Sequence, residues 1–178
     1  MIDLLRFIGL VNGAVWFGSA VYQLLGVGPL ATSNDLRQAL GSANAPYFAG
    51  VIEHLLLSRF FWLHLVCGSI AILHAFAEWL YLGRTPRRWW AGLLGGLFAF
   101  NLLIGLTLNP HLERLHKSRY AVNFTAERRV AAARAYNFWD GAAGVLRICI
   151  LLGTGAYFWR TANQGSLTRF ISTAKFRG

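Results

Sequence analysis

The sequence predicts an all-α integral membrane protein, an up-down bundle of four transmembrane helices. Of its 178 residues 56% are hydrophobic and only 13% are charged, and the mean hydropathy is +0.44. The segment Trp89–Leu108 contains no charged residue, and about 20 apolar residues suffice to cross a hydrocarbon core of about 30 Å. Arg87 and Arg88 precede this segment, as is typical of a helix end at the membrane interface.

The first two apolar segments differ in their predicted length. The first is charge-free over Phe7–Asn34, and its helix should end near Leu25 because three helix-breaking residues follow, namely Gly26, Gly28 and Pro29. The second is charge-free over Phe60–Ala77. Its helical pattern runs from about Val51 to Leu82, so we expect this helix to extend beyond the bilayer.

The other two transmembrane segments are Trp89–Leu108 and a fourth from about Trp139 to Trp159, whose helix should begin earlier because an Ala-rich stretch precedes it. Between them Asn109 could cap a helix that has Pro110 in its first turn. Its spaced leucines and basic residues predict a short interfacial amphipathic segment. We therefore divide the chain into a transmembrane domain, residues 1–160, and a basic tail, residues 161–178.

The formal net charge of +10 points to anionic lipid headgroups as partners, each basic residue near the surface contributing about 1 kcal/mol. Nucleic acid is the weaker explanation in so apolar a chain, and we expect none to bind. Lys and Arg divide equally between the two sides of the predicted bundle. The compact Arg84–Arg88 cluster favours cytoplasmic termini, and we expect the protein in a bacterial inner (cytoplasmic) membrane.

His64 and His74 are candidate cofactor ligands, because ionisable residues within a membrane span often have a function. Ten residues separate them, roughly 15 Å along a helix and about 80° around it. They therefore cannot bind one metal together or sandwich one haem. Either could be the axial ligand of a tetrapyrrole, haem b or a chlorophyll-type pigment. The more ordinary interpretation is a neutral histidine bonded to a carbonyl or hydroxyl group, and no metal site is indicated.

Four further polar residues lie within predicted spans: Asp140, Arg147, Asn12 and Asn101. Asp140 and Arg147 are seven residues apart and so share a helix face. We expect them to neutralise each other inside the bundle, or Arg147 to pair with Glu53, rather than to form an ion relay. Asn12 and Asn101 could form hydrogen bonds between helices, typically worth about 0.6 kcal/mol.

Several short motifs carry a resemblance to a known family: the run Gly13–Gly18, the Pro46-Tyr47-Phe48 entry to the second helix, Asn109-Pro110 and the run Tyr136–Gly141. In these the chain resembles a poorly characterised family of four-helix integral membrane proteins of unknown function. That family includes bacterial relatives of a eukaryotic transmembrane protein associated with cisplatin resistance. Its members tend to have His-Gly where this chain has Asp140-Gly141. The resemblance implies fold and topology, with no established activity.

No hydrolase, kinase or redox motif is present, and we expect no enzyme activity. The sequence favours a non-enzymatic accessory or scaffold subunit of a larger membrane complex. The alternative is a tetrapyrrole-binding subunit of an electron-transfer or photosynthetic complex, and a transporter is a third choice because polar residues are scarce. We expect the tail to contact lipid or a neighbouring subunit through its basic and aromatic residues, namely Arg169, Phe170, Lys175, Phe176 and Arg177.

Overall fold

The predicted fold class is confirmed by a computed structural model, which describes residues 2–29, 33–41, 44–82 and 88–174, with side chains from 4–29, 33–41, 44–81 and 88–163. Four helices in this part of the chain are long and apolar enough to cross a membrane, and the same ranges contain no strand. The elements are α1 (Ile2–Tyr22), the π-helix η1 (Gln23–Val27), α3 (Asn34–Leu40), α4 (Ala45–Leu82), α5 (Arg88–Leu103), the π-helix η2 (Ile104–Leu108), α6 (Asn109–Tyr120) and α7 (Ala126–Ala174).

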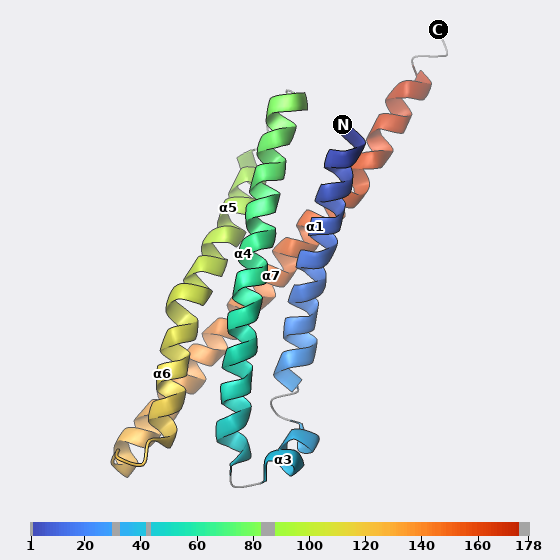
Figure 1. The fold of residues 1–178 in the computed structure, drawn as a ribbon. Coiled ribbons are helices and arrows are strands. Elements are labelled where there is room, and N and C mark those ends of the chain that lie inside the picture. The colour runs from blue at the N-terminus through green and yellow to red at the C-terminus, as the bar shows by residue number, and fades with distance from the viewer. Residues whose placement is uncertain (1, 30–32, 42–43, 83–87, 175–178) are drawn as a thin grey trace.

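The helices α1, α4 and α5 run side by side, and α7 crosses them diagonally (Figure 1). Towards the end where both termini lie α7 packs mainly on α1, and towards the other end it packs on α6. The backbones of α4 and α7 rarely approach each other closely. Long polar and aromatic side chains therefore fill the space between these two helices.

The second and fourth helices are longer than a bilayer crossing requires, in agreement with the sequence prediction. The 38 residues of α4 correspond to about 57 Å of helix, nearly twice the thickness of a hydrocarbon core of about 30 Å. The helix α7 has 49 residues and continues through residue 160 to Ala174. The five tail residues named above, Arg169 to Arg177, lie beyond the last described side chain, residue 163.

The third span does not end at Asn109, contrary to the expected cap. Leu108, before α6, has helical dihedral angles and offers no side-chain cap, and the Asn109 N–H donates to the Ile104 carbonyl. Pro110 lacks an N–H and its ring crowds the preceding turn. The wider π turn of η2 accommodates this ring, so α5, η2 and α6 form one nearly straight rod (Figure 1).

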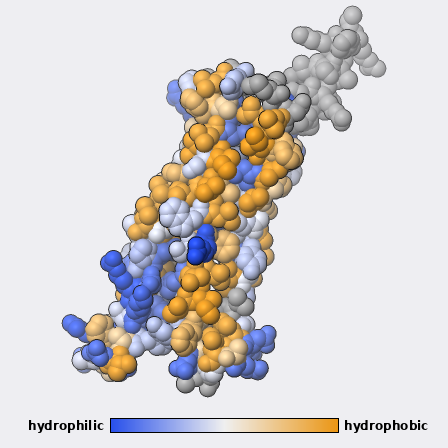
Figure 2. Space-filling view, in the orientation of Figure 1, coloured by the Kyte–Doolittle hydropathy of each residue, from blue (hydrophilic) through white to orange (hydrophobic). Residues whose placement is uncertain are grey.

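The molecular surface is apolar over most of the visible face of the bundle and carries more polar side chains at the end where α6 lies (Figure 2). Within the most apolar window of each candidate span only 28–33% of the residues are buried. Such helices would be unstable in water, but in lipid an apolar exterior is the expected state. The inward faces hold Trp16, Leu112 and Thr154, which are almost fully buried.

Candidate functional site

His64 is held inside the bundle by two residues of α1. The Trp16 Nε1–H donates to His64 Nδ1 at 3.1 Å, so Nδ1 carries a lone pair and a neutral ring has its proton on Nε2. That nitrogen lies 3.4 Å from the Ser19 hydroxyl oxygen, and the Ser19 hydroxyl itself donates to the Trp16 carbonyl at 2.8 Å. His64 is 2% exposed, and both ring nitrogens face protein groups.

His74 joins α4 to α1 nearer the termini. Its Nε2 lies 2.9 Å from the Leu5 carbonyl oxygen and donates to it. The ring rests on Gly9, where a Cβ would come within 2.7 Å of the histidine nitrogen. Only glycine therefore allows the two helices to approach this closely. A second hydrogen bond joins the same two helices at Asn12, whose side-chain amide donates to the Cys67 carbonyl at 3.0 Å.

His116 repeats this arrangement between α6 and α4. Its Nε2 donates to the Tyr47 carbonyl at 3.0 Å, and the ring lies against Gly50, where a Cβ would come within 2.1 Å of a ring carbon. Four further rings surround it at centroid distances of 5.1–5.8 Å, those of Tyr47, His54, Tyr120 and Tyr136. Both ring nitrogens of His54 are buried and have no hydrogen-bond partner among the described residues.

Arg147 of α7 lies between two carboxylates. One of its terminal nitrogens is 3.9 Å from Glu53 of α4, and the other is 3.8 Å from Asp140, two helical turns earlier on α7. The arginine and glutamate side chains are mostly buried, whereas the Asp140 side chain is 42% exposed. Both distances exceed the range of a hydrogen bond. Arg147 Nε and Nη2 therefore have no hydrogen-bond acceptor in the described part of the chain.

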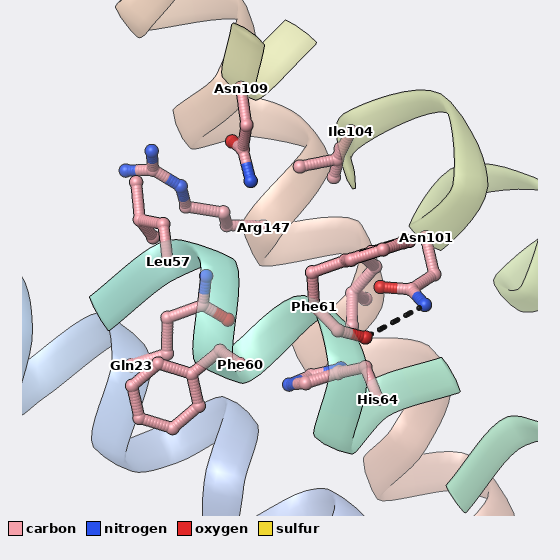
Figure 3. A pocket seen from close by; sticks show the side chains of 10 residues that line it. Gln23, Leu57, Phe60, Phe61, His64, Asn101, Ile104, Asn109 and Arg147 are labelled. Carbon is pink, nitrogen blue, oxygen red and sulfur yellow. Dashed lines mark hydrogen bonds between the residues drawn. The ribbon is translucent and has the colours of Figure 1, made fainter. Parts of the chain in front are cut away.

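A small pocket opens beside Arg147 (Figure 3), with a free volume of about 10 Å³, roughly the room that one water molecule needs. Apolar side chains of α4, η2 and α7 form most of its wall, and the polar lining residues are Gln23, His64, Asn101, Asn109 and Arg147. Asn101 donates to the Phe61 carbonyl at 3.5 Å, but the buried Asn109 Oδ1 has no donor among the described residues. The pocket thus has several polar groups in a largely apolar wall.

The structure brings together only some of the residues that the sequence singled out. His64, Asn101 and Arg147 line one pocket, Asp140 is next to Arg147, and His74 and Asn12 lie elsewhere, between α1 and α4. No three His, Cys, Asp or Glu residues in the described ranges are placed to hold a metal ion.

Sequence reasoning missed His54, His116, Gln23 and Asn109 as lining or cluster residues. One signal was available for His116. It is the middle member of Leu112, His116 and Tyr120, which are spaced four apart and therefore share a helix face. In the structure that face is buried, with Leu112 at 0% and His116 at 3% exposure.

Together the fold and this polar interior define a class, a four-helix integral membrane protein with hydrogen-bonded histidines between its helices. A family model described as "Domain of unknown function (DUF4149)" matches residues 13–121, and the chain belongs to that family. No curated protein matches the chain. No solved structure matches it either.

Proposed function

We propose that the protein is a non-enzymatic accessory subunit of a larger membrane complex, and that α5 binds a transmembrane helix of a partner subunit. The observation that carries this proposal is a stripe of small residues on α5, formed by Ala91, Gly92, Gly95, Gly96 and Ala99. Four of these residues are exposed and Gly96 is partly exposed. The spacing of four between them is the one that lets two membrane helices approach closely.

The contrast with the glycines inside the bundle supports this assignment. A Cβ on Gly105 or Gly153 would collide with Phe61 or Leu97, because neighbouring helices already occupy those notches. A Cβ on Gly92, Gly95 or Gly96 would meet nothing within 4 Å. These three notches are thus available to a second membrane helix.

Substitution on the stripe tests the proposal. Gly95→Leu fills the notch without touching the described interior, so we expect binding of the partner subunit to fall about tenfold, equivalent to about 1.4 kcal/mol. Gly18→Leu is the matched control, because Gly18 is an exposed α1 glycine with open space around it. Quantitative co-purification from native membranes measures the effect. Equal recovery of partners with both variants would contradict the proposal, and loss of a dimer alone would identify the partner as a second copy.

A tetrapyrrole-binding subunit is the second candidate, favoured by the two histidines buried within the spans, His64 and His74. Axial ligation needs an imidazole lone pair, and that of His64 Nδ1 receives the Trp16 N–H. A haem b or chlorophyll-type pigment on His64 would therefore have to displace Trp16. The absorption spectrum of protein purified from native membranes tests this candidate. A Soret band lost in His64→Gln or His74→Gln would favour pigment binding over the accessory role alone.

We further propose that the protein lies in a bacterial inner membrane with both termini cytoplasmic, because the short loop on their side contains the compact Arg84–Arg88 cluster. We also propose that anionic lipid headgroups bind the basic residues at the opposite end of the bundle. Exposed arginines are numerous on α6 and α7 at the end away from the termini, namely Arg114, Arg128, Arg129 and Arg134, and exposed Phe138 and Trp139 lie near them, a composition suited to the interface. Alkaline phosphatase fused after residue 123 should be active, and fused at the C-terminus inactive. The opposite pattern would reverse the orientation.

A further inference from the structure

We propose that the pocket beside Arg147 binds a single uncharged hydroxyl group, supplied by the alcohol end of a membrane-soluble amphiphile. The buried polar atoms that have no hydrogen-bond partner among the described residues define the chemistry. Arg147 Nε and Nη2 present N–H donors, and Asn109 Oδ1 presents an acceptor. A single group that accepts a hydrogen bond from Arg147 and donates one to Asn109 would satisfy both residues. A hydroxyl oxygen does both, whereas an ether, ester or carboxylate oxygen only accepts.

The carboxyl groups beside Arg147 disfavour an anion in this pocket. Arg147 already has Glu53 and Asp140 within 4 Å, so its positive charge is already offset. A phosphate or carboxylate would meet two like charges. An uncharged ligand encounters no such repulsion, and its hydroxyl gains the hydrogen bonds that buried polar atoms otherwise lack.

The size of the pocket limits what enters it. A volume of about 10 Å³ is enough for one oxygen atom and too small for a ring or a headgroup. The rim residues Gln23 and Phe60 are partly exposed, so a hydrocarbon chain attached to the oxygen can remain outside. In Figure 3 the amides of Gln23 and Asn109 approach the Arg147 side chain from opposite sides.

The two π-helical segments of the bundle independently point to the same place. Gln23 opens η1, Ile104 opens η2 and Asn109 follows η2, and all three residues line the pocket. A π turn is rare inside α-helices and is frequently found at functional sites. Here one lies on each side of the pocket, in helices that are remote in sequence.

Water is the other source of such a hydroxyl, and a photoreactive long-chain alcohol distinguishes the two. The full-length protein in phosphatidylcholine nanodiscs is labelled with a diazirine-bearing alcohol or with its methyl ether, which keeps the chain and loses the O–H. We expect the alcohol to label the peptides that contain Gln23 and Phe60, and the ether to label them weakly. In Asn109→Leu, which removes the acceptor at similar volume, labelling by the alcohol should fall about fivefold, as for the loss of one hydrogen bond.

Thermal unfolding of the same samples completes the test. Dodecanol should raise the melting temperature of the wild type and not that of Asn109→Leu, and the methyl ether should raise neither. Equal labelling by alcohol and ether, or labelling that Asn109→Leu leaves unchanged, would overturn the proposal. If Asn109→Leu has a lower melting temperature but dodecanol does not raise the melting temperature of the wild type, the pocket holds water only, and the amphiphile is overturned as the ligand.

Discussion

Histidine side chains join the helices of this protein through main-chain carbonyl groups. His74 reaches from α4 to Leu5 of α1, and His116 reaches from α6 to Tyr47 of α4. In each case the ring lies against a glycine of the helix that supplies the carbonyl. The carbonyl can accept this second hydrogen bond because its oxygen has two lone pairs. The glycine is therefore as necessary to the contact as the histidine.

Gly50→Ala should destabilise the bundle, since the new Cβ would lie 2.1 Å from a ring carbon of His116. We expect a loss of about 1–3 kcal/mol, the usual cost of overpacking, measured as the midpoint of detergent unfolding. Gly18→Ala, with open space at its Cβ, is the control and should change little. If steric conflict is the cause, adding His116→Ala to Gly50→Ala should cost less than His116→Ala costs in the wild type. Additive losses would contradict this explanation.

Arg147→Met should be more harmful than its position in a largely apolar helix suggests. The change leaves Glu53 without its cation, and removal of one partner from a buried ion pair costs about 3 kcal/mol or more. Glu53→Gln in the Arg147→Met background should restore part of the stability, because no uncompensated charge then remains on α4. Thermal unfolding in nanodiscs measures both. A double variant no more stable than Arg147→Met would show that the Glu53 charge is not the source of the loss.

For single residues, the sequence predicted pairwise contacts better than it predicted which side chains form a cluster. The seven-residue spacing indicated the approach of Asp140 to Arg147, and Glu53 was foreseen as an alternative partner. His54 and His116 were not predicted as site residues, because they lie outside the charge-free segments from which the transmembrane helices were predicted. Their contact depends on α4 and α6 packing side by side, and no local sequence pattern shows that pairing.

Among the elements, the rod formed by α5, η2 and α6 departs most from sequence expectation. Asn before Pro usually reads as the start of a new helix, and the amphipathic composition of α6 would suit a helix lying on the membrane. Yet α6 packs mainly on α7 and on α4. The buried side chains of α6 thus pack on other helices rather than on the lipid surface.

A spin-label distance tests whether the rod is continuous. Phe100 and Lys117 are both exposed, and in a straight helix cysteines at these positions would lie about 26 Å apart along the axis. If α6 instead turned by a right angle into the membrane plane at Pro110, the same helical rise would give a separation of about 18 Å. Double electron–electron resonance of Phe100→Cys/Lys117→Cys should report the longer distance. The exposed Cys149 is replaced by serine first.

Across the whole molecule, one half of the bundle should be solvated by lipid and the other by water. Leu73 and Leu152 are 66% and 68% exposed within the apolar stretches of α4 and α7, and Arg134 is exposed near the start of α7, among other basic residues. An exposed side chain in this protein should therefore contact either lipid or water. The positions of the charged residues in the sequence indicate which of the two it contacts.

Cysteine accessibility makes this division measurable. Arg134→Cys should react with a membrane-impermeant maleimide in intact nanodiscs, whereas Leu73→Cys and Leu152→Cys should react at least about tenfold more slowly, because a thiol in hydrocarbon is hardly ionised. Solubilisation in denaturing detergent should make the three rates similar. Comparable rates in intact nanodiscs would place the bilayer elsewhere along the helices.

The π turn of η2 also affects how the chain tolerates changes in length. A turn closed from residue i to i+5 holds one residue more than an α turn. Deleting the exposed Thr107 would let the chain close as an ordinary α-helix, with the faces of α5 and α6 keeping their orientations. A deletion in the middle of α5 would instead rotate every later side chain by about 100°. Members of the family that are one residue shorter should therefore have their gap at η2, where the loss of a residue leaves the helix in phase.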